Sequence, residues 1–467
     1  MVAESGPFDA VVLGSGESGK WLAWTLAESG QKTAVIERQY IGGSCPNIAC
    51  LPSKNEIFGA RVAALARRGA QYGVRTTPIA VDMAGVRERK RKMVASEVEF
   101  HLARYRAAGV DLILGDGRLV GPKELEVRTN EGAKRRVAGS KLFLDVGTHA
   151  SVPDLPGLRA ARPMTHIEAL ELDHAPGHLI VLGGGSVALE LAQAARRFDA
   201  QVTVIARAPQ LLAKEDPDIA EGMLQLFRDE GIEVLLNARV VGVTGRSGTA
   251  VHVAVHHDGM DRAVEGTDLL VGMGREPNTR GIGLEEAGVQ LDDRGYVRVN
   301  DRLETTAPGV WAMGECAGSP QFTHVAFDDY RVVSTNLAGG DRTTRDRLIP
   351  LCLFTDPEFV RVGATKGDLR SQKVGYRVFR LPMANVLRSA TTSEGRGFLK
   401  ALVASDSDRI LGFSAFGAEG SELLAAVQTA MMAGLPSTAL RDAIFAHPTV
   451  AEGLVFLFRT PPVPGGS

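Results

Sequence analysis

The sequence has few cysteines and no long apolar segment. Only 4 of its 467 residues are cysteine, which is too few for a disulfide framework and is typical of proteins in a reducing cytoplasm. No window reaches about 18 uninterrupted apolar residues, which argues against a membrane-spanning helix. The first residues contain no basic segment followed by an apolar core, so we expect no secretory signal. These absences predict a cytoplasmic protein.

An excess of charge of one sign is also missing. The 53 basic and 55 acidic residues leave a formal net charge of -2, which gives no reason to expect a nucleic acid or an anionic membrane as partner. A length of 467 residues exceeds one hydrophobic core and predicts about three domains. Glycine, with 53 residues, is abundant, as expected of a chain with several nucleotide-binding turns.

Two of the cysteines lie in one short stretch, residues 42–54 (GGSCPNIACLPSK). Cys45 and Cys50 are about one helical turn apart, so two thiols at the start of a helix can meet on one face. A helix N-terminus lowers the pKa of a thiol and favours the reactive thiolate. We therefore predict a redox-active disulfide; two structural cysteines or half of a metal site are the alternatives. Cys316 and Cys352 are each alone in an apolar run, so no second pair completes a zinc site and we predict no metal.

The segment before these cysteines has the pattern of a dinucleotide-binding unit. An apolar run at 10–13 is followed by a glycine turn, a helical segment, a second apolar run at 33–36 and an acid. The N-terminus of the helix can hold a pyrophosphate, and the acid can accept hydrogen bonds from a ribose. The predicted residues of this site are Gly14, Gly16, Gly19 and Glu37.

A second unit of the same kind begins with the apolar run at 179–182. Its turn has alanine in place of the third glycine, which the pattern allows. Where an NAD site would have an acid, this chain has Ala206 followed by Arg207. Without the carboxylate, nothing at this position repels the 2′-phosphate of NADPH, and the Arg207 guanidinium can bind that phosphate. We therefore predict NADPH over NADH. The alternative is that Arg207 is an exposed loop charge. The predicted residues of this site are Gly183, Gly185, Ala188 and Arg207.

Two such units predict an α/β fold with two Rossmann-like domains. They also imply two dinucleotides, FAD and NADPH being the natural pair, because a dehydrogenase with one cofactor needs only one unit. From about residue 348 the nucleotide signals end, and β-prone runs precede a helical stretch at 421–433, which predicts a separate α+β domain. This last block contains His447, presented by a proline turn, and Glu452. The two are a possible base and its orienting carboxylate, with an ordinary surface histidine as the alternative.

Taken together, these motifs resemble the flavin-dependent pyridine nucleotide-disulfide oxidoreductases, which include dihydrolipoyl dehydrogenase, glutathione reductase and mercuric reductase. The resemblance covers essentially the whole chain and includes the segments at 274–279 and 314–315. It implies an FAD-binding domain in two parts, an NAD(P)H-binding domain between them and a C-terminal dimerisation domain. The expected boundaries are 1–150 and 281–346 for the FAD domain, 151–280 for the NAD(P)H domain and 347–467 for the dimerisation domain.

The resemblance also implies roles for single residues. Cys50 is then the charge-transfer thiolate against the flavin, and Cys45 is the interchange thiol that attacks the substrate. Lys54 and Glu190 pair beside the flavin N5 and the nicotinamide. His447 protonates the leaving thiolate, is held by Glu452 and comes from the other subunit, so the resemblance implies a homodimer. The cofactor-binding residues that it adds are Gly43, Ser44, Lys54, Gly147, Gly274, Gly314 and Glu315.

The predicted enzyme is thus a flavoprotein disulfide reductase that passes electrons from NADPH through FAD to Cys45–Cys50 and on to a disulfide or a reactive oxidant. The alternatives are an NAD-linked dihydrolipoyl dehydrogenase, a mercuric reductase, or, in another class, a flavin electron-transfer or metal-binding protein whose two cysteines are ligands. The segments 318–324 and 328–331 are similar to bacterial oxidant-defence reductases that use hypothiocyanous acid. Two departures from the family are Asp145, where Ala-Thr-Gly usually begins, and Glu315, where aspartate is usual. No motif selects the substrate.

Overall fold

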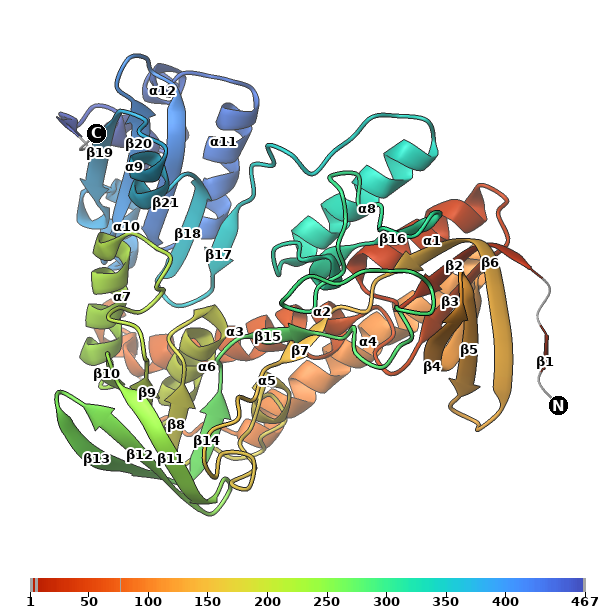
Figure 1. Cartoon of the computed structure of the whole chain (residues 1–467). Coiled ribbons are helices and arrows are strands. Elements are labelled where there is room, and N and C mark those ends of the chain that lie inside the picture. The colour runs from red at the N-terminus through yellow and green to blue at the C-terminus, as the bar shows by residue number, and fades with distance from the viewer. Residues whose placement is uncertain (1–2, 5–6, 76, 465–467) are drawn as a thin grey trace.

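A computed structural model describes residues 3–4, 7–75 and 77–464, and its sheets define three bodies (Figure 1). The first body is built on a sheet in which β2, β3, β4, β6 and β16 run parallel. Residues 10–12 and 34–35 are fully buried, because a parallel sheet that is covered on both faces uses near-continuous apolar runs. The strands of this body are β1 (Ala3–Glu4), β2 (Phe8–Leu13), β3 (Thr33–Glu37), β4 (Asp111–Gly121), β5 (Glu124–Thr129), β6 (Lys134–Leu144) and β16 (Val310–Ala312).

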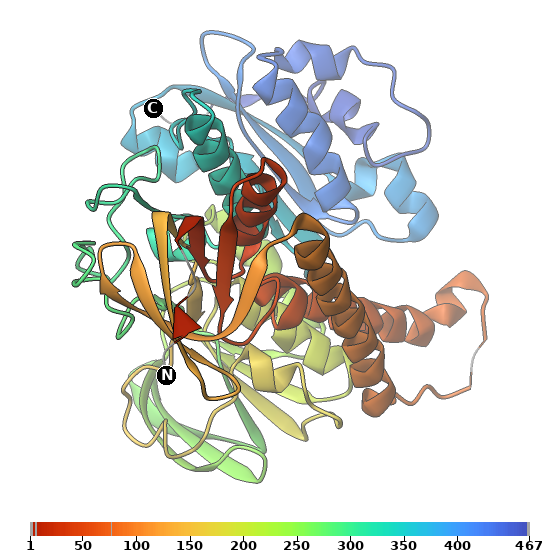
Figure 2. The same ribbon diagram turned by 90° about the vertical axis from the view of Figure 1, so that its right-hand side faces the viewer.

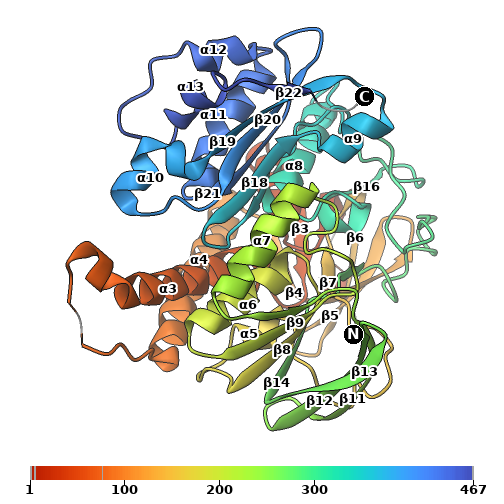
Figure 3. The same ribbon diagram turned by 90° about the vertical axis from the view of Figure 1, so that its left-hand side faces the viewer.

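The helices of the first body surround the cysteine stretch. The long helices α3 and α4 pack side by side, and the end of their hairpin extends beyond the rest of the chain (Figures 2 and 3). Helix α8 packs on α1 although the two are about 300 residues apart in the sequence, as the hydrogen bond between Thr25 and Tyr330 (|i−j| = 305) shows. The helices are α1 (Glu17–Glu28), α2 (Ser44–Asn47), α3 (Cys50–Arg67), η1 (Gly69–Tyr72), α4 (Met83–Ala108), η2 (Gly314–Ala317) and α8 (Thr323–Leu337).

The second body is a smaller unit with the same alternation of strands and helices. Its parallel sheet has the order β10-β9-β8-β14, and an antiparallel sheet, β11-β12-β13, lies beside it. The antiparallel pair β7 (Thr148–Ala150) and β15 (Arg275–Pro277) lies where the chain passes between the two bodies. The other elements are α5 (His166–Ala169), β8 (His178–Leu182), α6 (Ser186–Arg197), β9 (Gln201–Ile205), α7 (Pro217–Asp229), β10 (Glu233–Leu235), β11 (Arg239–Arg246), β12 (Ala250–His257), β13 (Met260–Gly266) and β14 (Asp268–Val271).

The third body has a different architecture. Its antiparallel sheet has the order β17-β18-β21-β20-β19-β22 and is covered by helices, so the α+β prediction is confirmed. Its elements are β17 (Leu351–Leu353), β18 (Glu358–Gly363), α9 (Lys366–Ser371), β19 (Tyr376–Pro382), η3 (Met383–Asn385), α10 (Leu387–Thr392), β20 (Phe398–Ala404), β21 (Ile410–Gly417), α11 (Gly420–Met432), α12 (Ser437–Arg441), α13 (Gly453–Leu457) and β22 (Val463–Pro464). Among the described residues, none of the helices combines the length and apolarity needed to cross a membrane.

Buried charges join the second body to the third. Lys400, whose side chain is 1% exposed, donates to Asp216 at 2.7 Å and to Asp218 at 2.6 Å, both at the start of α7. Arg361 pairs with Glu215 at 2.7 Å in the same segment. Figure 3 shows α7 between the two sheets. Removing one partner of a buried pair leaves an uncompensated charge, so these contacts fix how the two bodies sit together.

Candidate active site

The cysteine stretch folds as two short pieces of helix rather than one. Cys45 lies in the four-residue helix α2, the helix breaks at Ala49 (φ −129°, ψ −99°), and Cys50 is the first residue of α3. The prediction that both thiols lie at the start of one helix is therefore wrong, because the two cysteines belong to two separate helices. Gly43 has φ +84°, and a Cβ there would lie 2.6 Å from the Cα of Gly16. This close approach brings the stretch directly against the first glycine turn.

The two thiols lie close enough to share a hydrogen bond, and both are free and half-buried. The hydrogen bond from Cys45 is the main reason that the pKa of Cys50 falls to about 6. Thr323, whose Oγ1 lies 3.2 Å from the Cys50 Sγ, and the nearby Lys54 also lower that pKa, against the effect of burial. The same hydrogen bond and burial raise the pKa of Cys45. These surroundings favour the thiolate at Cys50 and the thiol at Cys45.

A partly buried ion pair lies near the Cys50 thiol. The Lys54 Nζ is 2.7 Å from the Glu190 Oε2, and the Glu190 side chain is 7% exposed. The backbone N–H of Phe354 donates to the Glu190 Oε1 at 2.8 Å, and the Lys54 ammonium lies 4.9 Å from the centre of the Phe354 ring. The pairing of Lys54 with Glu190 is thus present in the structure. These residues come from all three bodies, so the pair marks the point where the bodies meet.

The first glycine turn forms one wall of a cavity of about 350 Å³ that also contains Cys45, Glu315 and Thr323. Gly14 has φ +97°, and a Cβ there would lie 2.3 Å from the carbonyl oxygen of Asp145. Only glycine fits this position. The turn runs into the N-terminus of α1, where unpaired backbone N–H groups favour an anionic phosphate. The residues present therefore fit the pyrophosphate of a dinucleotide.

The carboxylates of this cavity are already engaged by the protein. The Glu37 Oε2 accepts from the N–H and hydroxyl of Ser15 at 2.9 and 2.7 Å, and its Oε1 accepts from the N–H groups of Gln39 and Tyr40. Glu37 therefore closes the turn between the two strands, and its contact with a ribose stays a prediction. Glu315 accepts from the Thr148 hydroxyl and pairs with Arg275 at 3.3 Å. Its contact with the ribityl chain likewise stays a prediction.

Asp145 is a residue whose importance the sequence showed only as a departure from the family pattern. It is buried behind the glycine turn and accepts from the Gly19 N–H at 2.6 Å. A Cβ at Gly16 or Gly19 would lie 2.7 or 2.8 Å from its Oδ2. Burial raises the pKa of Asp145 well above its ordinary value, and Asp329 adds to that rise. The raised pKa favours the neutral form of the side chain, which packs against the turn.

The second glycine turn has the same geometry in the second body. Gly183 has φ +129°, and a Cβ there would lie 2.3 Å from the Gly272 carbonyl oxygen. Ala188 packs against Gly272, and Gly185 precedes α6 and faces open space. Glu190 lies on the same helix, so one helix carries both the turn and the carboxylate of the ion pair.

The remaining predicted residues fall at the edges of the site. Arg207 is exposed just after β9. Its neighbour Ala206 packs against the second glycine turn, because a Cβ added at Gly184 would lie 3.1 Å from the Ala206 Cβ. Gly147 (φ +63°), Gly274 (φ +120°) and Gly314 (φ +66°) are turn residues; Gly147 and Gly314 line the cavity, as Ser44 does.

His447 and Glu452 pair in the third body. The His447 Nδ1 lies 3.1 and 3.0 Å from the two carboxylate oxygens of Glu452. The Nδ1–H therefore donates, and Nε2 is left as the basic nitrogen. The imidazole is 61% exposed. His447 is not among the described residues that line the cavity around Cys45.

Sequence reasoning missed several residues that complete the site. Thr323, at the start of α8, contacts Cys50, and Phe354 contacts the ion pair. His166 lines the cavity with its Nε2 buried and without a hydrogen-bond partner in the described structure. Phe354 and His166 belong to no motif named in the sequence analysis. Thr323 lies in the segment 318–324, which was named only for its similarity to oxidant-defence reductases and not as a contact of Cys50.

This fold and site define an oxidoreductase with two dinucleotide-binding bodies and a dithiol centre. The family model "Pyridine nucleotide-disulphide oxidoreductase" matches residues 8–329, and the model of that family's dimerisation domain matches residues 349–457. The chain belongs to the pyridine nucleotide-disulphide oxidoreductases. It is therefore an enzyme of a family that binds FAD and a pyridine nucleotide, and the predicted family and fold class are confirmed.

Individual relatives agree with this assignment. The chain is 35% identical over 459 residues to the probable pyridine nucleotide-disulfide oxidoreductase RclA of Escherichia coli, covering 97% of this chain and 98% of the relative. It is 32% identical to a mercuric reductase of Shigella flexneri, covering 98% of this chain and 81% of the relative. A solved structure described as the Cu(II) complex of the HOCl-induced flavoprotein disulfide reductase RclA superimposes with a TM-score of 0.88 at 33% identity, covering 97% of this chain and 99% of that one.

Proposed function

We propose that the protein is an NADPH-dependent flavoprotein reductase whose Cys45–Cys50 pair delivers electrons to a disulfide or a reactive oxidant. The observation that carries this proposal is the placement of two free thiols against the first glycine turn, with the Cys50 Sγ 3.2 Å from the Thr323 Oγ1 and the Lys54–Glu190 pair nearby. These surroundings lower the pKa of Cys50 and raise that of Cys45, which favours one thiolate and one thiol. A centre with one thiolate and one thiol fits two-electron exchange with a disulfide.

Different residues of the chain have different roles in this reaction. FAD, when bound in the first cavity, supplies two-electron transfer between the nicotinamide and the sulfur atoms. Lys54 and Glu190 lie at the junction of the bodies, where their ion pair fixes the approach of the nicotinamide domain to the cysteines. Two electrons and one proton reduce the Cys45–Cys50 disulfide to a thiolate at Cys50 and a thiol at Cys45. Cys45 gives up its proton as it attacks a substrate disulfide, and the thiolate that leaves takes that proton. The Cys50 thiolate then attacks the Cys45 sulfur, which restores the Cys45–Cys50 disulfide and releases the second substrate thiolate.

Support for NADPH as the electron donor comes from the residues that follow β9 in the second body. Ala206 replaces the acid that would repel a 2′-phosphate, and the exposed Arg207 follows directly at the end of β9. The exposed guanidinium of Arg207 is available to such a phosphate. Dihydrolipoyl dehydrogenase running with NAD is the second candidate, and this pair of residues weighs against it.

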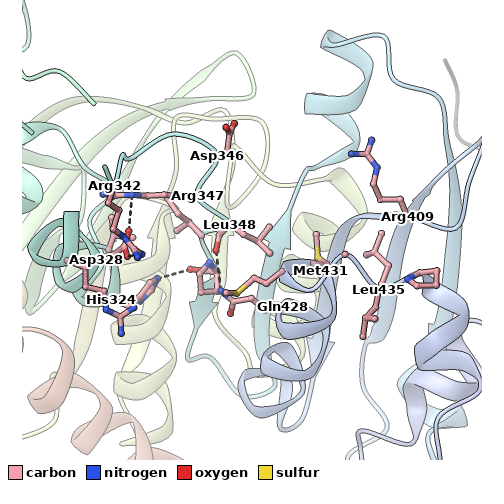
Figure 4. Close-up of a pocket in the computed structure, with 18 of the residues that line it drawn as sticks. His324, Asp328, Arg342, Asp346, Arg347, Leu348, Arg409, Gln428, Met431 and Leu435 are labelled. Atoms are coloured by element: carbon pink, nitrogen blue, oxygen red, sulfur yellow. Dashed lines mark hydrogen bonds and ion pairs between the residues drawn. The ribbon is translucent and has the colours of Figure 1, made fainter. Parts of the chain in front are cut away.

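We further propose a homodimer in which His447 completes the partner's site as the proton donor for the leaving thiolate. Supporting this, His447 is held by Glu452 yet is not among the described residues that line the cavity around Cys45, and Ile444 just before it is 101% exposed. A cavity of about 1050 Å³ between α8 and the third body is partly lined by apolar residues such as Met432, which is 72% exposed (Figure 4). A second copy that covers this face would bury that apolar surface.

Several finer assignments rest on the same reasoning. We keep the four segments 1–150, 151–280, 281–346 and 347–467 as the proposed domains, since β7 and β15 pair where two of the boundaries fall. A cytoplasmic location is proposed from the cysteine usage. A reactive oxidant as substrate is supported by the similarity to RclA, whose solved structure is described as that of an HOCl-induced reductase. Mercury reduction is the less favoured alternative.

The test is steady-state oxidation of NADPH and NADH by the purified yellow protein with a panel of acceptors. The panel holds lipoamide, glutathione disulfide, mycothione, hypothiocyanous acid and mercuric ion. We expect NADPH turnover with one acceptor, and loss of that turnover in Cys45→Ser with the flavin still bound. A preference for NADH with lipoamide would contradict the assignment of Arg207 and favour dihydrolipoyl dehydrogenase.

A further inference from the structure

A buried lysine lies beneath the turn that precedes the two cysteines. The side chain of Lys20, on the first turns of α1, is 7% exposed. Its ammonium lies 2.8 Å from the Glu17 Oε2, 3.0 Å from the His101 Nε2 and 3.5 Å from the carbonyl oxygen of Gly42. An ammonium has three N–H donors, so this arrangement engages all of them. Burying a lysine is costly unless it is paired in this way.

His101, on α4, is held in one tautomer by its neighbours. Its Nδ1 lies 2.6 Å from the carbonyl oxygen of Glu97, which can only accept, so Nδ1 carries the proton. Nε2 then has the lone pair that accepts from Lys20. Burial and the charge of Lys20 lower the pKa of His101, which favours the same neutral form. The ring stacks on Trp24 at 5.9 Å and packs against Gly42, where a Cβ would lie 3.0 Å from it.

Glu17 places a carboxylate at the wall of the cavity assigned to FAD. It is the first residue of α1, directly after the glycine turn, and it lines the cavity with Gly16 and Cys45. The indole N–H of Trp21 donates to its Oε1 at 2.8 Å, so the carboxylate is fixed by Trp21 on one oxygen and by Lys20 on the other. The pyrophosphate of a dinucleotide binds at this helix N-terminus. An uncompensated carboxylate at that position would repel it.

We propose that Lys20 is a positioning residue that neutralises Glu17 at the pyrophosphate wall and ties α1 to the Gly42–Gly43 turn, so that the cavity retains its anionic cofactor beside the cysteines. The inference rests on the assignment of this cavity to FAD. Glu17 and Lys20 occupy positions at which the glycine pattern does not specify the residue type. Lys20 acts on the cofactor through Glu17 and the turn, and it takes no part in the electron transfer.

The experiment measures how fast the purified holoprotein releases FAD after dilution, followed by the rise in flavin fluorescence. Four proteins are compared: wild type, Lys20→Met, Glu17→Gln and the double variant. Lys20→Met leaves Glu17 unpaired, and we expect FAD release to become about tenfold faster or more, in line with the cost of breaking a buried pair. The double variant removes both charges, and we expect its release rate to return to within about threefold of wild type.

Lys92→Met is the matched control. It removes a lysine that pairs with Glu88 at 3.7 Å on α4 but is 75% exposed, and we expect unchanged FAD release. If Lys20→Met and the double variant lose FAD equally fast, Lys20 serves only as packing and the inference is overturned.

Glu17→Gln keeps the test usable if Lys20→Met does not fold. This variant leaves the ammonium without its carboxylate, so we expect FAD release slower than in wild type; faster release would contradict the inference. Should the wild-type protein bind no FAD at all, the assignment of the cavity fails instead. The two failures are therefore distinguishable.

Discussion

The hydrogen bond between the two thiols makes a quantitative prediction about Cys50. In the structure this bond is the largest reason that the pKa of Cys50 is about 6. Cys45→Ala removes the donor, whereas Cys45→Ser replaces it with a hydroxyl and keeps it. Comparing these two variants isolates the hydrogen bond, because both leave Cys50 as the single thiol of the pair.

The size of the effect follows from the strength of such a bond. A hydrogen bond to a charged group contributes about 1.5–3 kcal/mol, which corresponds to roughly 1–2 pKa units. The pKa of Cys50 should therefore rise to about 7–8 in Cys45→Ala and stay near 6 in Cys45→Ser. At pH 7 the thiolate fraction would fall from about nine tenths to between about one half and one tenth.

The assay is the rate of alkylation of Cys50 by iodoacetamide as a function of pH, with the modified peptide quantified by mass spectrometry. The charge-transfer absorbance between the thiolate and the flavin gives a second titration in the holoprotein. Peptide analysis separates Cys50 from Cys316 and Cys352, which are a buried and a half-buried thiol. Equal titration midpoints in the alanine and serine variants would refute the role of the hydrogen bond. Midpoints near 8.5 in both would show that the site does not lower the pKa at all.

Three further predictions concern the surroundings of the pair. The pKa of Asp145 is raised in the folded state, so its contribution to the free energy of unfolding is complete below its unfolded pKa and is lost as pH rises. Asp145→Asn should therefore match the wild-type Tm in acid and raise Tm by about 2–4 °C at neutral pH. Thermal melts of both proteins across pH measure this difference. Arg207→Glu should lower the ratio of kcat/KM for NADPH to that for NADH by roughly 10–100-fold; an unchanged ratio in steady-state kinetics would exclude Arg207 from the 2′-phosphate site. His447→Ala should lower kcat by about 10²–10⁴-fold, and Glu452→Gln by less, because that variant leaves the base in place; equal losses in the same assay would mean that Glu452 does more than orient the ring.

The parts of the fold that depend on local patterns were predictable from the sequence. The expected strand at 10–13 is observed at 8–13 and that at 33–36 at 33–37, since a buried parallel strand is a continuous apolar run. Both glycine turns lie directly after their strands, as predicted. Glycine marks these turns in the sequence because a positive φ, such as the +129° of Gly183, requires glycine. These features are specified within a few residues, and reading them needs no knowledge of tertiary contacts.

The contacts that tune the chemistry were not predictable in this way. Cys50 and Thr323 are 273 positions apart, so no spacing rule connects them. The break at Ala49 was also missed, because alanine itself has high helix propensity and its own residue type gives no reason for a stop there. Asp145 was visible only as an unusual residue, and its burial behind the glycine turn depends on how β6 ends beside β2. In each case tertiary packing decides the role.

The ion pair of Lys54 and Glu190 links the chemistry to the placement of the three bodies. Lys54 belongs to α3 of the first body and Glu190 to α6 of the second, and the N–H of Phe354 holds Glu190 from the third. A rotation of the second body would break these contacts and leave Glu190, which is largely buried, without its partners. The Lys400 pairs, which join the second body to the third, oppose that rotation. The charges between the bodies therefore keep the second body aligned with the cysteines, and weakening them should loosen the site before it unfolds any one body.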